Sequence, residues 1–469
     1  MTDDIGFMPA AEMLAGFRDR RLSPVEVMEA VLARAEALQP RLNAFTLIDA
    51  EGARAAARAS EARWQSGQPL GRLDGVPVTV KDLLLTRGWP TRRGSHTVDP
   101  DQPWTEDAPV VARLREHGAI PFAKTTTPEY GWKGLDDSPL TGFTRNPWNP
   151  ERTPGGSSGG AAAQVAAGIG PLALGTDGGG SIRIPAAFCG IFGLKPSFGR
   201  VPAWPASPFS TVAHVGPMTR SVTDAGLMLT VLAEPDWRDW YALPPSGADY
   251  CDGLEAGIAG LRIAWSPDLG HADLHPEVAA LTEAALDGLR EQGAQVERID
   301  PPFADPAETF WTHWLMGARN LLRNLTPAQR EKLDPGLRHC FEDSLDITVE
   351  QILDAQNARA ALGLTMNRLH QDYDLLATPS LAVPAFPLGR LDPDGREDRN
   401  WLGWTPFSYP FNLTQQPAAT MPCGLTADGL PVGLQLVGPM HADALVLRAA
   451  RAFEQARPWH DRRPLLPAG

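Results

Sequence analysis

The sequence alternates between segments with the pattern of a strand and segments with the pattern of a helix. In "DGVPVTVKD" (74–82), Val76, Val78 and Val80 stand at every second position, which predicts a strand that ends at Lys81 and Asp82. Four further segments continue the alternation: a helix over 108–118, a strand over 119–125, a small-residue helix over 158–168 and a strand over 170–177. Such alternation favours an α/β fold.

Capping signals and turns extend this reading to both ends of the chain. Ser23, followed by a proline and then by Glu26, predicts a capping box, and Thr348 with Gln351 predicts a second one. Asp428-Gly429 predicts a hairpin turn. Residues 200–260 have a loop-rich pattern. The other expected elements are helices over 50–67, 276–293 and 442–455 and strands over 261–266 and 374–380. No linker divides the chain, so we expect a single large domain over residues 1–469.

Charge and cysteine content exclude several classes of protein. The formal net charge is −14, which argues against binding to nucleic acid or to an anionic membrane surface. The cysteines are scattered, and His271 and His275 lack a third ligand, so we expect no metal, no disulfide framework and no cofactor. The acidic N-terminus does not resemble a secretory signal, and we expect a cytoplasmic protein. The cysteines are Cys189, Cys251, Cys340 and Cys423.

Two glycine-rich segments surround the expected helix over 158–168: "TPGGSSGG" (153–160) and "GTDGGGS" (175–181). Neither has the lysine of a phosphate-binding P-loop, and "GTDGGGS" does not fit the dinucleotide-binding fingerprint. Consecutive glycines also allow backbone N–H groups to converge on a carbonyl oxygen beside a nucleophile. We therefore interpret Ser181 as a nucleophile.

A nucleophilic serine needs a base. The histidines His96, His117 and His214 lie in contexts without a motif. Lys81 ends a valine-rich strand, where desolvation would lower its pKa and provide a neutral amine, although it could instead pair with Asp82. Beside the nucleophile, an ion pair between Asp177 and Arg183 would support the loop.

Three motifs together resemble the amidase signature family. They are "GVPVTVKD", "TPGGSSGGAAA" and "GTDGGGSIRIPAAFCGIFGLKPSFGRV", and the similarity continues through "RNPWNP", "VGPMTRSVTDA", "DLLATPS" and "MPCGLTADGLPVGLQLVGP". The resemblance implies a central twisted mixed β-sheet with helices on both sides. It places a signature core at about 70–235, a variable pocket region at about 235–370 and the C-terminal part of the core at 371–469. It also gives a weak precedent for a homodimer.

The resemblance also assigns roles to individual residues. It implies a Ser-Ser-Lys triad in which Ser181 is the nucleophile, Ser157 the bridging serine and Lys81 the base. It implies a cis peptide bond between Gly156 and Ser157 and a substrate-contacting backbone at Gly131. The implied oxyanion hole consists of the N–H groups of Gly178, Gly179, Gly180 and Ser181.

The same family offers two kinds of activity. Free-standing members hydrolyse amides, whereas one subunit of a tRNA-dependent amidotransferase holds glutamine through charged residues. Here "WTPFSY" (404–409) carries no charge, which argues against the glutamine-binding subunit. Aromatic residues of the variable region instead favour a hydrolase of bulky apolar or aryl amides, with carbamates and esters as related substrates. A non-catalytic scaffold subunit is a third hypothesis. Candidate pocket residues are Tyr130 and the aromatic residues Trp311, Trp314, Trp401, Trp404, Phe407, Tyr409 and Phe411.

Overall fold

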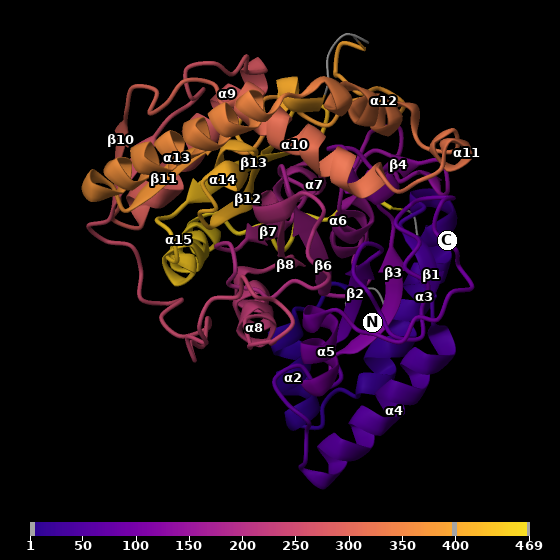
Figure 1. The fold of residues 1–469 in the computed structure, drawn as a ribbon. Coiled ribbons are helices and arrows are strands. Elements are labelled where there is room, and N and C mark those ends of the chain that lie inside the picture. Colours follow the sequence, from indigo (N-terminus) through magenta and orange to yellow (C-terminus); the bar gives the residue numbers. More distant parts are fainter. Residues whose placement is uncertain (1–4, 396–400, 467–469) are drawn as a thin grey trace.

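A mixed β-sheet forms the centre of the protein (Figure 1). The computed structural model describes residues 5–395 and 401–466, and within these residues the sheet has 11 strands. Their order is β1 (Phe45–Ile48), β3 (Ile120–Thr125), β2 (Pro77–Lys81), β6 (Leu172–Asp177), β8 (His214–Thr219), β7 (Phe192–Lys195), β12 (Ala418–Leu425), β13 (Pro431–Val437), β11 (Leu375–Pro379), β9 (Arg262–Trp265) and β10 (Gln295–Arg298). The predicted α/β fold is confirmed.

Parallel pairs lie toward both edges of the sheet, and a run of antiparallel pairs from β6 to β11 lies between them. Strand β2 is parallel to both β3 and β6, whereas β8 is antiparallel to β6 and β7. In the C-terminal half, β13 is antiparallel to β12 and β11, and β9 is parallel to β10 and β11. All five residues of β2 are buried, because this strand has neighbours on both edges and is covered on both faces.

Helices cover the sheet (Figure 1). Successive side chains of a strand point to opposite faces, so Leu172 and Leu174 of β6 belong to the large core that includes α8 and α15, whereas Ala173 packs with α6 and with Ala186 of α7. The helices are α2 (Ala10–Arg18), α3 (Pro24–Leu42), α4 (Ala50–Ser66), α5 (Pro109–Glu116), α6 (Gly159–Ala166), α7 (Arg183–Cys189), α8 (Val222–Leu232), α9 (Pro276–Glu291), α10 (Ala307–Leu322), α11 (Pro327–Arg330), α12 (Pro335–Asp343), α13 (Val349–Asp372), α14 (Pro410–Leu413) and α15 (Asp443–Ala456).

Local sequence signals explain several of these boundaries. The Ser23 side chain accepts hydrogen bonds from the backbone of Val25 and Glu26 at the start of α3, and the Glu26 carboxylate accepts one from the Ser23 N–H. Thr348 and Gln351 form the second predicted capping box, at the start of α13. Both predictions are confirmed.

The prediction of a loop-rich region over 200–260 is wrong in part, because β8 and α8 lie there. The strand "HVGPMT" contains glycine and Pro217, which usually interrupt strands. It is nevertheless buried between β6 and β7, where packing outweighs the local preference. The Ser221 side chain accepts a hydrogen bond from the N–H of Asp224, which fixes the start of α8. In the described ranges, no helix is both long and apolar enough to span a membrane.

Candidate active site

Lys81 lies at the carboxyl end of β2, beside the parallel strand β6. Its side chain is fully buried. Its Nζ lies within hydrogen-bond distance of three hydroxyl groups, 2.7 Å from Ser157 Oγ, 2.8 Å from Ser158 Oγ and 2.9 Å from Thr176 Oγ1. The parallel register of β2 and β6 brings residues 95 positions apart into contact. Lys81 is therefore held among hydroxyl groups.

The environment of Lys81 favours its neutral form. Desolvation by burial lowers its pKa to about 7, although the charges of Asp136 and Asp177 act in the opposite direction. The Asp136 carboxyl is also buried, and burial raises its pKa above the usual range. The alternative pairing of Lys81 with Asp82 is wrong, because Asp82 lies 3.3 Å from Lys124 Nζ in a fully buried ion pair. A neutral lysine amine can accept a proton.

Ser157 and Ser158 stand just before α6. The peptide bond between Gly156 and Ser157 is cis, as the family resemblance implied. A side chain at Gly156 would collide with the backbone carbonyl of Leu135, so glycine is required at this close approach. The N–H of Ser158 donates to the carbonyl of Ser181 at 3.2 Å, which ties the two glycine-rich segments together.

Ser181 follows the glycine run in the turn between β6 and α7, and its exposed fraction is 5%. In the described part of the chain, the N–H groups of Gly178, Gly179 and Ser181 donate to no protein acceptor. The Gly180 N–H instead donates to Asp177 Oδ1 at 2.8 Å. Of the four predicted oxyanion-hole donors, three are therefore free to bind a ligand and one already has an acceptor.

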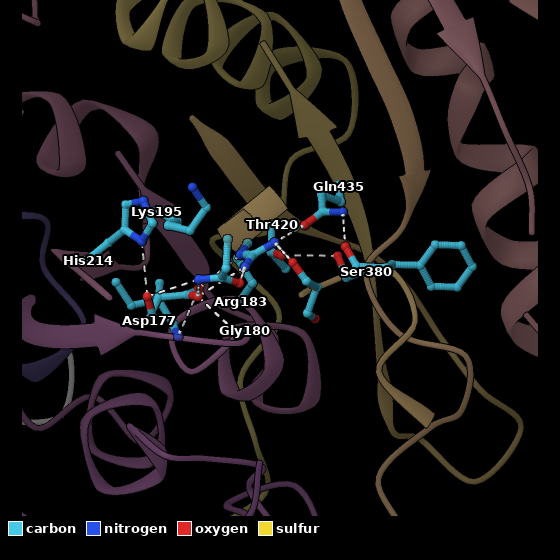
Figure 2. A network of polar contacts seen from close by, with 12 residues as sticks. Asp177, Gly180, Arg183, Lys195, His214, Ser380, Thr420 and Gln435 are labelled. Carbon is cyan, nitrogen blue, oxygen red and sulfur yellow. Dashed lines mark hydrogen bonds and ion pairs between the residues drawn. The ribbon is translucent and has the colours of Figure 1, made fainter. Parts of the chain in front are cut away.

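A buried polar network supports the loop of Ser181 (Figure 2). Arg183 donates through Nε to Asp177 Oδ2 at 2.9 Å and through a terminal nitrogen to Oδ1 at 3.0 Å, and both side chains are fully buried. The expected ion pair is present. Arg183 also donates to the Ser408 carbonyl, to Gln435 and to Asn412. This network links the nucleophile loop to β13 and α14.

The same network controls the charge of Asp177. Burial alone would raise the pKa of this carboxyl, but the charge and hydrogen bonds of Arg183, together with the charge of Lys195, lower it below the usual range. His214 Nδ1 lies 2.9 Å from the Val212 carbonyl oxygen and 3.2 Å from that of Asp177 (Figure 2). Burial lowers the pKa of His214 well below its usual value. His214 is a neutral histidine of the network, which the sequence did not distinguish from other histidines.

Ser157 and Ser181 line one cavity of about 170 Å³. Gly131, Tyr130 and Gly178 also contribute to its wall. Most of the wall is apolar: Leu83, Leu84, Ala108, Pro109, Val110, residues 202–206, Phe209, Val215, Trp314 and Leu321. The loop over 202–209 supplies Trp204 and Phe209, and no pattern in the sequence indicated that these residues line the cavity.

Tyr130 and Gly131 adopt left-handed backbone conformations, with φ of 53° and 74°. The Tyr130 hydroxyl lies 2.6 Å from Thr97 Oγ1, which fixes its ring. A Cβ added at Gly131 would lie 3.2 Å from Ser157 Oγ. The backbone at Gly131 therefore directly adjoins the Ser157 hydroxyl.

Most of the aromatic residues predicted for the pocket lie elsewhere. Trp404 stacks on Phe188 with ring centroids 5.7 Å apart, and its Nε1 donates to the Leu391 carbonyl. The Tyr409 hydroxyl donates to Asp305 at 2.9 Å. Neither residue lines the cavity, whereas Trp314 does. Trp401 packs against Gly179, on the side away from the cavity lining. Phe407 and Phe411 belong to two separate buried clusters. Trp311 lines a second hollow together with Tyr409.

The two histidines with metal-like spacing have other contacts. His275 accepts a hydrogen bond from the N–H of Glu277 and caps α9, while His271 Nδ1 lies 2.9 Å from the Leu269 carbonyl. Among the residues that the structure describes, no group of three or more histidine, cysteine, aspartate or glutamate side chains is placed to hold a metal.

Comparison with known proteins gives consistent matches over nearly the whole chain. Residues 26–447 match the family model described as Amidase. An acylamidase of Rhodococcus erythropolis is 40% identical over 468 residues, 98% of each chain. A glutamyl-tRNA(Gln) amidotransferase subunit from Chloroflexus aggregans is 36% identical over 476 residues, 94% of this chain and 95% of that protein. The crystal structure of a bacterial aryl acylamidase of the amidase signature family has a TM-score of 0.92 at 33% identity and covers 98% of this chain and 99% of that one.

Proposed function

Since this chain belongs to the amidase family, we propose that it hydrolyses bulky apolar or aryl carboxylic amides with Ser181 as nucleophile and Ser157 and Lys81 as its proton relay. The observation that carries the proposal is the 2.7 Å contact between the Lys81 amine and the Ser157 hydroxyl. Full burial lowers the pKa of that amine, and Ser157 shares a cavity with Ser181.

The hydrogen bonds around Lys81 support its role as the base. Ser158 donates its own hydroxyl hydrogen to the Thr176 carbonyl, so it accepts from Lys81. A neutral amine has two N–H groups and one lone pair. If Ser158 and the Thr176 hydroxyl accept the two N–H groups, the lone pair is directed to the hydroxyl hydrogen of Ser157. Lys81 then receives the Ser157 proton while Ser157 receives that of Ser181.

The reaction then proceeds in two stages. The Ser181 oxygen attacks the amide carbon, and the C–N bond breaks as the relay returns a proton to the leaving amine. Water attacks the resulting ester through the same relay and releases the carboxylic acid. In both stages, the free N–H groups of Gly178, Gly179 and Ser181 would stabilise the oxyanion. The same steps apply to carbamates and esters.

The second candidate is glutamine hydrolysis, which the similarity to the amidotransferase subunit favours. Free glutamine carries an ammonium group, whose burial requires a negatively charged partner. No described residue that lines the cavity is a carboxylate. We therefore prefer the amide hydrolase, and ammonia release from glutamine measures the alternative directly.

A serine-directed fluorophosphonate tests the proposal. The expected result is one adduct by intact mass on the unmodified protein and on Ser210→Ala, whose serine lies outside the cavity lining, and no adduct on Ser181→Ala. Hydrolysis of acetanilides by the unmodified protein and by Ser210→Ala, but not by Ser181→Ala, would complete the test. A folded protein that forms no adduct would instead support a non-catalytic scaffold.

A further inference from the structure

Arg93 is the one cationic side chain among the described residues of the cavity wall. Its backbone is fixed on both sides, because its N–H donates to the Asp82 carbonyl at 3.1 Å and its carbonyl accepts from the Tyr130 N–H at 2.7 Å. Arg93 also has a left-handed backbone, with φ of 56°. Through Tyr130 it adjoins Gly131, which faces the Ser157 hydroxyl. Arg93 is thus anchored beside the proposed catalytic residues.

The Arg93 guanidinium has no acidic partner within residues 5–395 and 401–466. Asp82 and Asp107, which adjoin the wall residues Leu83 and Ala108 in the chain, lie beside other cations. Asp82 pairs with Lys124 at 3.3 Å, and Asp107 lies 3.6 Å from Arg115. The described part of the wall also contains no carboxylate. The cavity therefore presents an uncompensated positive charge in an apolar surrounding.

Such a charge selects for an anion. The Arg93 side chain is half-buried, so it has lost part of its hydration, and an electrostatic contact there is stronger than one in open water. The planar guanidinium fits the two oxygens of a carboxylate. The remaining wall fits an apolar or aryl body.

We propose that Arg93 binds a carboxylate on the substrate, so that the enzyme prefers amides that carry a carboxylate group over neutral amides of the same shape. This inference rests on the proposed amide hydrolysis. It adds a specificity-determining residue at one wall of the cavity. The positive charge of this residue is opposite in sign to the net charge of the protein. Arg93 takes no part in the proton relay.

Matched ligands test the proposal without turnover. In the Ser181→Ala protein, binding is measured by calorimetry for 4-acetamidobenzoate and for 4-isopropylacetanilide, in which an uncharged isopropyl group replaces the carboxylate. A second pair, succinanilate and 4-methyl-N-phenylpentanamide, carries the same change on the acyl side. We expect tighter binding of the carboxylate member of at least one pair.

Variants at Arg93 provide the decisive comparison. When Arg93→Gln is added to the Ser181→Ala protein, that carboxylate ligand should bind about ten-fold more weakly relative to its neutral counterpart. A change of this size is expected for the loss of one charged hydrogen bond. Arg93→Lys should restore part of the preference. The matched control Arg92→Gln removes a neighbouring guanidinium that does not line the cavity and should leave the ratio unchanged.

The outcomes separate this inference from the proposed function. Equal binding of both members of both pairs, or an equal loss for both on Arg93→Gln, would overturn the role of Arg93 even if Ser181 hydrolyses amides. A carboxylate preference that depends on Arg93 would support it even if the unmodified protein formed no fluorophosphonate adduct, and the failure would then lie with the proposed reaction.

Discussion

Gly131→Ala tests whether the position of Ser157 limits the reaction. The added Cβ would lie 2.8 Å from Leu83 Cδ1 and 3.2 Å from Ser157 Oγ. The end of the Leu83 side chain can move aside. Ser157 has less freedom, because its hydroxyl contacts Lys81 and the preceding Gly156 lies against the Leu135 backbone. The new methyl group should therefore displace the serine hydroxyl by a few tenths of an ångström.

Two separate effects set the expected magnitude. The left-handed φ of 74° at Gly131 costs an alanine about 1–2 kcal/mol of stability. A misplacement of about 1 Å costs about 100-fold in rate, so the smaller displacement expected here should lower kcat about ten-fold, equivalent to about 1.4 kcal/mol in the activation barrier. The loss of stability and the loss of rate are independent quantities.

Gly67→Ala is the matched control. Gly67 has a φ of 73° and ends α4, and a Cβ there would meet no atom within 4 Å. Urea denaturation should give both variants a similar loss in the free energy of unfolding, while kcat for a neutral acetanilide should fall only in Gly131→Ala. A Gly131→Ala enzyme with unchanged kcat would refute the reasoning, and an equal loss of kcat in both would show a global effect.

Three other changes test charge, packing and specificity at the same site. The proposed base Lys81 has to be a neutral amine, and burial lowers its pKa to about 7, so kcat/KM should fall as the pH decreases through neutrality. A pH–rate profile that stays flat down to about pH 5 would contradict the proposed base. Arg183→Met leaves the buried Asp177 without its cation and should lower the free energy of unfolding by about 3–5 kcal/mol in urea denaturation, and a loss below about 1 kcal/mol would argue against the pair's structural role. Phe209→Ala should raise KM for aryl amides about ten-fold, because Phe209 lines the cavity. Trp404→Leu should reduce stability without altering the ratio of aryl to alkyl KM values, because Trp404 stacks on Phe188 away from the cavity. The reverse pattern would contradict this assignment of the cavity lining.

Elements with a strong local signal could be predicted from the sequence. The valine alternation before Lys81 and the capping boxes at Ser23 and Thr348 depend only on near neighbours, and the structure contains each of them. Strand β8 could not be predicted in this way. Its Pro217 and its glycine favour a loop locally, and only the pairing with β6 and β7 stabilises the strand.

The cavity wall was the least predictable part of the site. Trp401, Trp404 and Tyr409 were reasonable candidates because aromatic residues dominate both cores and pockets, and they lie in the core behind the glycine run or beside α7. The residues that do line the cavity come from irregular segments. Trp204, Phe209 and Arg93 belong to no periodic pattern, so their direction is set by contacts distant in sequence.

The proposed catalytic residues are explained by strand order, which one sequence cannot provide. Val80 of β2 is paired with Leu174 of β6 in a parallel register, so the carboxyl ends of both strands lie at the same edge of the sheet. Lys81 therefore meets Thr176, and the turn after β6 carries Ser181 to the same place. The sequence predicts both strands but contains no local information that they are neighbours. Before the structure, only the motifs of the amidase signature family connected these positions. Arg93 lies outside those motifs, so the resemblance could not indicate it.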